Sequence, residues 1–129
     1  MNPFGEVPIL VDGDLTLRDS QAILINLARK YGGETWFPID ADAMAHVAEW
    51  LMVAENEVAR GPYDARLHDK FGYKLNHRVA VEKSARLLDV VESHLGKRNW
   101  LALDRPTIAD VACFPYIALG HEGHSACSL

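Results

Sequence analysis

Hydrophobic and polar positions follow two different periods along the chain, and the change of period predicts the order of its elements. Val7–Val11 is a short apolar run, and Leu15–Leu17 alternates as a half-buried strand does. Asp12-Gly13 lies between them and predicts a two-residue hairpin with a type I′ turn, because that turn needs positive φ. From Asp19 onward the apolar spacing becomes helical, so the pattern predicts a hairpin followed by a helix.

The predicted first helix has a start signal and a stop signal. Asp19 and Ser20 are helix-capping residues placed immediately before the apolar pattern. Gly32-Gly33 is predicted to end the helix, since glycine accepts the left-handed conformation at a helix C-terminus. Residues 34–39 contain Pro38, which breaks helices, and predict a linker held by its aromatic side chains. The expected apolar face of the helix consists of Leu24, Ala28 and Tyr31.

Two long helices are predicted next. The first begins at Asp40 or Asp42 and runs to about Arg60, where Gly61-Pro62 predicts a sharp stop. The second spans about residues 77–95. The buried face of the first is expected to contain Met44, Val47, Leu51, Ala54 and Val58. The buried face of the second is expected to contain Val81, Ala85, Leu88, Val91 and Leu95.

A third helix is predicted after the capping sequence Thr107-Ile108-Ala109-Asp110. The Thr107 hydroxyl is placed to accept from the Asp110 N–H, and the Asp110 carboxylate to reach back to the Thr107 N–H. The residues that follow are apolar nearly all round, as expected of a central buried helix. Cys113 lies in this pattern and is predicted to be a buried thiol.

Composition and charge exclude several classes of function. The chain has 129 residues, 49% hydrophobic and 24% charged, as in globular proteins. Its net charge of −5 argues against nucleic acid as a partner. No apolar run approaches the roughly 20 residues of a membrane span, and the first residues lack the pattern of a signal peptide. Two cysteines are too few for a disulfide framework, so we expect a cytoplasmic protein without membrane contact.

The start of the first predicted helix carries candidate binding chemistry. A helix N-terminus has free N–H groups and a partial positive charge, so it can receive a carboxylate. Asp19 lies beside it and can receive an ammonium group. Together these groups suit the free end of an α-amino acid, whereas simple capping of the helix is the alternative interpretation of Asp19 and Ser20. Pro8 cannot donate a ladder hydrogen bond, so it marks a sheet edge or a special turn.

Two stretches of the sequence resemble the glutathione transferase family, and most closely its soluble bacterial members. Residues 2–31 combine the Val7-Pro8 step, the Asp-Gly hairpin and an acidic–Ser pair that opens a helix. Far downstream, residues 105–110, RPTIAD, resemble the start of the buried helix in the family's C-terminal domain. Two motifs in the right order are more specific than either alone, and the resemblance covers residues 2 to about 119.

The resemblance implies a fold of class α/β plus all-α. It assigns residues 1–33 to a partial thioredoxin-like unit, residues 34–39 to a linker and residues 40–129 to a helical bundle. The family's first βαβ unit, which holds its catalytic Ser, Tyr or Cys, has no counterpart in this sequence, so no catalytic residue is assigned. The family's last helices are also expected to be missing. Part of the helical core is then expected to be exposed, and the polar, glycine-rich end, GHEGHSACSL, to be frayed.

The resemblance also assigns binding roles. The Val7 main chain would pair with the cysteinyl part of glutathione, with Pro8 as a cis-proline that fixes the geometry. Asp19 would take the γ-glutamyl ammonium group, and Ser20 its carboxylate. Glutathione would be the co-substrate, a hydrophobic electrophile the second substrate, and the protein a homodimer. Candidates for lining the electrophile cleft are Tyr63, Arg66, Phe71 and Tyr73.

Other functions stay open at this point. The chain could be a non-catalytic interaction module or a gene fragment without function. A scaffold need not keep the acidic–Ser pair, so its presence beside Val7-Pro8 favours descent from a glutathione binder. No metal site is expected, because His46, Glu55 and Glu57 lack ligand spacing. The remaining set of possible ligands, at the C-terminal end, is only a weak pattern: His121, His124 and Cys127.

Overall fold

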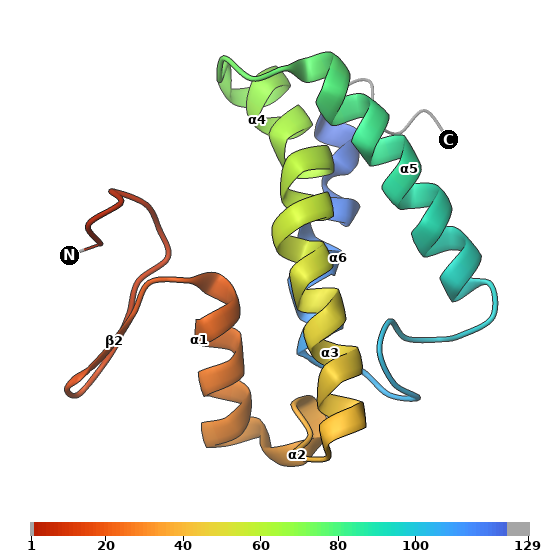
Figure 1. Cartoon of the computed structure of the whole chain (residues 1–129). Helices are drawn as coiled ribbons and strands as arrows, with labels where there is room; N and C mark the ends of the chain where they lie inside the picture. Colours follow the sequence, from red (N-terminus) through yellow and green to blue (C-terminus); the bar gives the residue numbers. More distant parts are fainter. Residues whose placement is uncertain (1, 124–129) are drawn as a thin grey trace.

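The computed structural model describes residues 2–123, which form a small N-terminal unit and a helical bundle (Figure 1). The N-terminal unit contains strands β1 (Leu10–Asp12) and β2 (Leu15–Leu17), helix α1 (Ser20–Leu27) and its π-helical continuation η1 (Ala28–Gly32). After the single turn α2 (Gly33–Trp36), the bundle contains α3 (Ala41–Val53), η2 (Ala54–Tyr63), α4 (Asp64–Phe71), α5 (His77–Leu95), α6 (Ile108–Ala118) and the short 3₁₀ turn η3 (Gly120–Glu122). The predicted order of a hairpin, a helix and a helical bundle is confirmed.

The hairpin is shorter than predicted. β1 and β2 pair antiparallel with Asp12 opposite Leu15, so Gly13 and Asp14 are the two turn residues. Gly13 has a φ of +62°, whereas Asp14 does not have positive φ. This is the pattern of a type II′ turn, with glycine at the first central position, and the predicted type I′ turn is wrong. The strand expected from Val7 onward starts at Leu10, because the preceding residues have no partner strand among the described residues.

Helix α1 begins as predicted, and Asp19 is its N-cap. The Asp19 carboxylate accepts a hydrogen bond from the Ala22 N–H at 2.8 Å. The helix continues through η1, and the chain turns at Gly33, whose φ of +62° and ψ of −159° are not the expected left-handed helical conformation. Ala28 is buried on the inner side, but Tyr31 is 71% exposed, so the predicted apolar face is only partly correct.

The sharp stop predicted at Gly61-Pro62 is wrong, because α3, η2 and α4 follow one another without a break. Pro62 has no N–H to donate, and a local π-helical register accommodates such a residue inside a helix. Gly61 has a second role here. A Cβ added to Gly61 would lie 3.1 Å from the backbone nitrogen of Ser84, so glycine allows η2 and α5 to approach closely.

The core of the bundle lies between α3, η2, α5 and α6, and Leu24 and Ile25 of α1 pack against it. The predicted inner face of the first long helix is confirmed in Val47, Leu51, Ala54 and Val58, which are all buried, and Met44 is half-buried. The face predicted for α5 is rotated. Of that set only Val91 is buried, and the inner face consists of Ala80, Ser84, Leu87 and Val91.

The rotation of α5 has a packing reason. The small side chain of Ser84 faces the closely approaching η2 segment, where a larger apolar side chain would not fit beside Gly61, and Ala80 is buried one turn earlier in α5. Ser84 is fully buried, and its hydroxyl is satisfied by the Ala80 carbonyl at 2.8 Å. A prediction based on hydrophobic spacing alone therefore chose the wrong side of α5 as the buried one.

The capping box at the start of α6 is confirmed. Thr107 and Asp110 exchange both predicted interactions, with the Asp110 carboxylate 2.9 Å from the Thr107 N–H. The second Asp110 oxygen accepts from the Leu101 N–H at 3.0 Å and so fixes the preceding loop. Cys113 is buried as predicted, at 1% exposure, and its thiol donates to the Trp50 carbonyl at 3.6 Å. Burial raises the pKa of this thiol to about 12.

The segment predicted as a linker is held at both ends. It contains the short helix α2, and Phe37 behind it is buried. The Arg105 guanidinium donates to the carbonyl oxygens of Glu34 and Thr35, at 3.3 and 3.1 Å. The Arg29 guanidinium donates to the Phe37 carbonyl at 3.1 Å. Arginines from the N-terminal unit and from the bundle therefore hold this connection.

The predicted fraying is not found at the first residues of the C-terminal segment. Glu122 of η3 pairs with Arg66 and with Lys70 on α4, and Gly123 is buried against α4. His124 and Cys127 lie outside the described residues. None of the helices within residues 2–123 combines the length and the apolar character that crossing a membrane requires.

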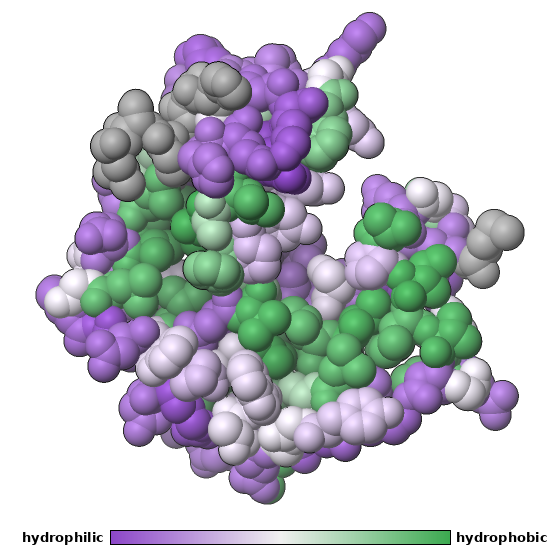
Figure 2. Space-filling model, turned by 180° about the vertical axis from the view of Figure 1, so that it is seen from behind, coloured by the Kyte–Doolittle hydropathy of each residue, from purple (hydrophilic) through white to green (hydrophobic). Residues whose placement is uncertain are grey.

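Apolar side chains are unevenly distributed over the surface. Figure 2 shows hydrophobic surface over the N-terminal hairpin and α1, on the right of that view. Large exposed side chains of this unit are Phe4, Val7, Ile9, Val11, Leu15, Leu27 and Tyr31. On α6 the expected all-round burial is wrong, because one side is exposed through Val111, Phe114 and Tyr116.

Candidate functional site

The four predicted site residues lie in the N-terminal unit. The Val7-Pro8 peptide bond is cis, and the Val7 side chain is 89% exposed just before β1. Asp19 and Ser20 lie together where β2 gives way to α1. Within residues 2–123, no hydrogen bond joins the Val7-Pro8 step to Asp19 or Ser20. Asp19 and Ser20 are therefore adjacent at the start of α1, and the Val7-Pro8 step precedes β1 without a hydrogen bond to them within residues 2–123.

The N-terminus of α1 retains free backbone donors. The first N–H groups of a helix have no partner within the helix. Asp19 satisfies one of them, since its side chain accepts from the Ala22 N–H, and its carbonyl accepts the first regular helical bond, from the Ile23 N–H at 2.9 Å. The N–H groups of Ser20 and Gln21 are left without a protein acceptor among the described residues. An anion placed there meets two donors and the positive end of the helix.

Glu55 of η2 lies against this helix start, and sequence reasoning missed the contact. Its carboxylate accepts from the Gln21 side-chain amide at 3.0 Å and from the Ser20 hydroxyl at 3.4 Å. The Gln21 side chain is buried, and its carbonyl oxygen has no hydrogen-bond partner among the described residues. Glu55 was expected to be solvated, and it is exposed, but it also couples the bundle to α1. The sequence holds no local signal of this contact, because residues 21 and 55 are far apart along the chain.

The four residues proposed for an electrophile cleft lie at the far end of the helical bundle, on or near α4. The Tyr63 ring packs at a tilt of 57° against Tyr116 of α6, with ring centroids 4.7 Å apart. Partial burial, with Tyr116 nearby, raises the pKa of the Tyr63 hydroxyl. Arg66 lies over the Phe71 ring and pairs with Glu122, and Tyr73 is 57% exposed. These contacts tie η2 to α6 and α4 to η3, and they supply a packing role for Tyr63 and Arg66.

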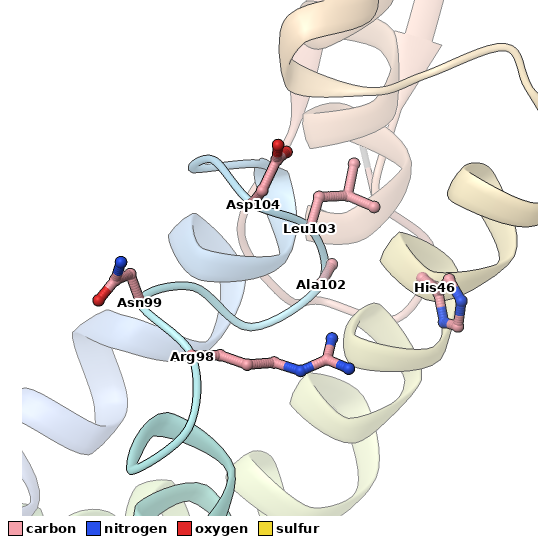
Figure 3. A pocket seen from close by; sticks show the side chains of 6 residues that line it. All are labelled: His46, Arg98, Asn99, Ala102, Leu103 and Asp104. Atoms are coloured by element: carbon pink, nitrogen blue, oxygen red, sulfur yellow. The ribbon is translucent and has the colours of Figure 1, made fainter.

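A separate hollow of about 580 Å³ opens beside α3 (Figure 3). The Arg98 side chain extends across it, between the loop before α6 and His46 of α3. None of the predicted site residues lines this hollow, which is lined by His46, Arg98, Asn99, Ala102, Leu103 and Asp104.

Known proteins of similar sequence and structure define the class of this fold. The glutathione S-transferase C-terminal domain matches residues 45–119. Glutathione S-transferase 3 of Zea mays is 34% identical over 127 residues, covering 85% of this chain and 53% of its own length. A glutathione S-transferase of Arabidopsis thaliana is 32% identical over 125 residues, covering 90% of this chain and 58% of its own length.

The structural matches agree. A crystal structure of a glutathione S-transferase from Xanthobacter autotrophicus superposes with a TM-score of 0.85 and 32% identity, over 95% of this chain and 62% of the other. A glutathione transferase family member from Pseudomonas fluorescens, solved with two glutathione molecules bound, superposes with a TM-score of 0.78 and 30% identity. The match covers 92% of this chain and 56% of the other. The chain thus spans between about half and three-fifths of the length of these relatives.

The fold defines a partial thioredoxin-like unit joined to the helical domain of a transferase. The domain match covers more than half of the chain, and the structural likeness extends through the hairpin and α1. The chain belongs to the glutathione S-transferase family. The resemblance inferred from the Val-Pro step, the acidic–Ser pair and the RPTIAD stretch is confirmed.

Proposed function

We propose that this chain binds glutathione and takes part in its conjugation to hydrophobic electrophiles. The observation that carries the proposal is the N-terminus of α1, where two free N–H groups lie beside the Asp19 carboxylate. A free amino-acid end has one carboxylate and one ammonium group, so it matches both partners. Two relatives support the ligand. The Pseudomonas fluorescens protein holds glutathione, and Ure2p5 of Phanerochaete chrysosporium was cocrystallized with 1-(S-glutathionyl)-2,4-dinitrobenzene.

Each predicted residue has a distinct role in this proposal. One Asp19 oxygen caps α1 by accepting from the Ala22 N–H, and the other oxygen takes the γ-glutamyl ammonium group. The Ser20 hydroxyl and N–H take the γ-glutamyl carboxylate, which requires the hydroxyl to turn away from Glu55. The exposed main chain at Val7, before the cis-Pro8 bond, pairs with the cysteinyl backbone as a strand edge takes a peptide.

Conjugation needs the glutathione thiolate, because the thiol is a poor nucleophile at neutral pH. The thiol loses its proton, the sulfur forms a bond to an electrophilic carbon, and a leaving group takes the bonding electrons where one is present. We assign no residue of this chain to thiol activation. The proposal for this chain is therefore anchoring and orientation of glutathione, in a glutathione-binding part at residues 1–33 that a linker at 34–39 joins to a helical part.

We further propose a cytoplasmic homodimer as the working form, with the exposed apolar surface of the N-terminal unit as the reason to expect association. Cross-linking and light scattering of the purified chain test this point. If the chain is monomeric at all accessible concentrations, the proposed dimer is wrong, whereas the proposal of glutathione binding is unaffected.

Isothermal titration with glutathione tests the binding proposal directly. Asp19→Asn keeps an oxygen that can cap α1 but removes the charge that faces the ammonium group. We expect wild-type chain to bind glutathione and Asp19→Asn to lose at least about tenfold in affinity, the size of one lost charge-assisted hydrogen bond. Asp40→Asn is the matched control. Asp40 caps α3 in the same way, accepting from the Ala43 N–H at 3.0 Å, so this change should leave the affinity unaltered.

The same titration distinguishes glutathione binding from the alternative function, a non-catalytic interaction module. A non-catalytic interaction module of this family need not bind glutathione. If the wild-type chain is folded by circular dichroism and takes up no glutathione, the interaction module becomes the better proposal.

A further inference from the structure

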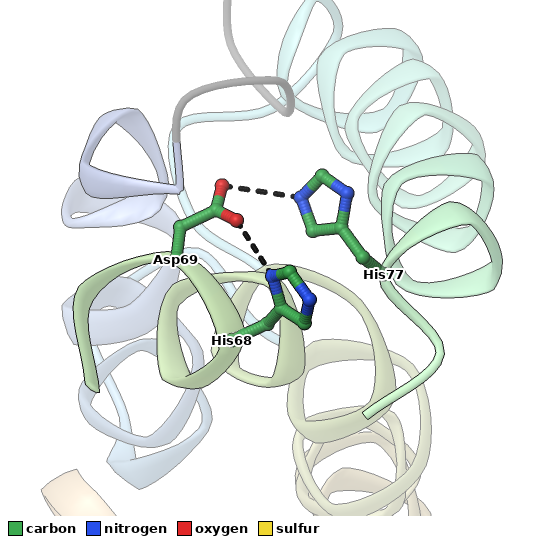
Figure 4. Close-up of side chains that lie close together, drawn as sticks. All are labelled: His68, Asp69 and His77. Atoms are coloured by element: carbon green, nitrogen blue, oxygen red, sulfur yellow. Dashed lines mark hydrogen bonds and ion pairs between the residues drawn. The ribbon is translucent and has the colours of Figure 1, made fainter. Parts of the chain in front are cut away.

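The end of α4 and the start of α5 bring two imidazoles onto one carboxylate (Figure 4). The His68 Nδ1 lies 2.8 Å from one oxygen of Asp69, and the His77 Nε2 lies 3.1 Å from the other. The two rings stack, with centroids 4.6 Å apart and planes 30° apart. Three side chains of metal-ligating type therefore converge across the loop between the two helices.

We propose that His68, Asp69 and His77 form a binding site for a divalent transition metal of the zinc type. Imidazole nitrogen and carboxylate oxygen are the ligands that such ions take, and three protein ligands with an open fourth position make a common zinc set. The site is independent of glutathione binding, since none of its residues belongs to the N-terminal unit.

The distances suit an ion. In a tetrahedral zinc site the ligand atoms lie about 3.3 Å from one another, given bonds of about 2.0 Å. Each imidazole nitrogen already lies close to that distance from one of the two Asp69 oxygens, at 2.8 and 3.1 Å, and one ligand atom from each of the three residues lies within 4.8 Å of the others. Rotation of side chains, with no backbone movement, is the change that coordination requires.

Access and charge also favour an ion. The His68, Asp69 and His77 side chains are 40%, 16% and 27% exposed, so an ion can reach them from solvent. His68 and Asp69 lie in the last turn of α4, where the helix dipole favours a cation, while the start of α5 at His77 opposes it.

Coordination replaces the hydrogen bonds that each ring now makes with Asp69. The ring nitrogen that donates to Asp69 loses its proton before it binds the metal, and in a neutral imidazole solvent passes that proton to the other ring nitrogen, which faces away from the ion. No oxidant or reductant is needed. The ion would clamp the loop Gly72–Asn76 by joining the residues on either side of it.

Calorimetric titration of the whole chain with zinc chloride, at pH 7.5 and without added thiol, tests the site. We expect one ion per chain, and His68→Gln and His77→Gln should each weaken zinc binding by more than about tenfold, the lower end of what the loss of an outer-shell partner costs. His46→Gln, on the exposed side of α3, is the matched control and should bind as wild type does.

A second variant separates this cluster from the C-terminal segment, which also holds possible ligands. His121→Gln/His124→Gln/Cys127→Ser should keep the zinc site of the wild type. In the wild-type chain, the imidazole nitrogen chemical shifts of His68 and His77 should change when zinc is added. This measurement needs no substitution at the site. Absence of zinc binding in wild type, unchanged binding in His77→Gln, or loss only in the triple variant would each overturn the proposal.

Discussion

The N-terminal unit and the helical bundle differ sharply in how much of their apolar surface they bury. In the bundle, Val47, Leu51 and Val58 are at most 1% exposed. In the hairpin, Val11 is 66% exposed and Leu15 is 39% exposed, and an isolated two-stranded hairpin is marginal in water. The stability of the chain therefore resides in the bundle, while the proposed binding chemistry lies on the unit that has little core of its own.

The largest expected effect tests this difference directly. Leu51→Ala empties a fully buried position between helices, so we expect the free energy of unfolding to fall by about 3 kcal/mol, within the usual range for Leu to Ala in a core. Val11→Ala on β1 should change it by less than about 0.5 kcal/mol. Urea unfolding followed by circular dichroism measures both. Equal losses for the two variants would show that the hairpin is part of the same core.

The next effect concerns the start of α6. Asp110→Ala removes the acceptor of both the Thr107 and the Leu101 N–H groups, and we expect a loss of about 2 kcal/mol in unfolding free energy. Asp104→Ala provides the control, because the Asp104 side chain is 93% exposed and its single ion pair within residues 2–123 is with its neighbour Arg105. If Asp110→Ala lowers the unfolding free energy no more than Asp104→Ala does, the capping box does not contribute to stability.

Elements with a local cause could be predicted from the sequence. The caps at Asp19 and Thr107, the helix over residues 77–95 and the face of α3 all depend on residues a few positions apart. Two of the errors arose where a distant contact decided the outcome. Gly61-Pro62 continues a helix because η2 packs closely on α5, and the inner side of α5 is set by the same close approach.

A smaller effect is expected where the two regions meet. Glu55→Ala removes the acceptor of the buried Gln21 amide, and we expect about 1 kcal/mol of destabilisation. Hydrogen exchange should become faster in α1 while the core of α5 keeps its protection, since the contact couples α1 to the bundle. Glu57→Ala is the control on the same segment, because Glu57 is exposed and forms no ion pair within residues 2–123. Uniform acceleration across the chain would contradict a local coupling.

The smallest expected effect depends on pH and concerns the ion pairs between Glu122 of η3 and helix α4. Hydrogen bonds from Lys70 and Arg66 lower the pKa of the Glu122 carboxyl from 4.5 to about 2. A group whose pKa is lower in the folded state stabilises it above the unfolded pKa, and this contribution is lost as the pH falls from about 4.5 to about 2. The Tm difference between wild type and Glu122→Gln should therefore be constant above pH 5.5 and shrink below it. A difference that does not vary between pH 7 and pH 3 would contradict the pairing.

The candidate site was predictable in part, for the same reason as the fold. Asp19 and Ser20 were found because a helix start has a local sequence pattern, and the structure places them there. Glu55 and the cluster of His68, Asp69 and His77 were missed. Their positions depend on how η2 meets α1 and how α4 turns into α5, and nothing in the spacing of those residues signals either contact.

The burial of Cys113 gives the chain a chemical reporter of its own unfolding. The thiolate is the nucleophile that reacts with alkylating reagents, and a thiol with a pKa of about 12 that is 1% exposed supplies almost none of it at neutral pH. Modification of Cys113 therefore requires the α3–α6 contact to open. The rate at which mass spectrometry finds a Cys113 adduct, resolved from Cys127 by peptide mapping, would measure how often the bundle opens without any denaturant.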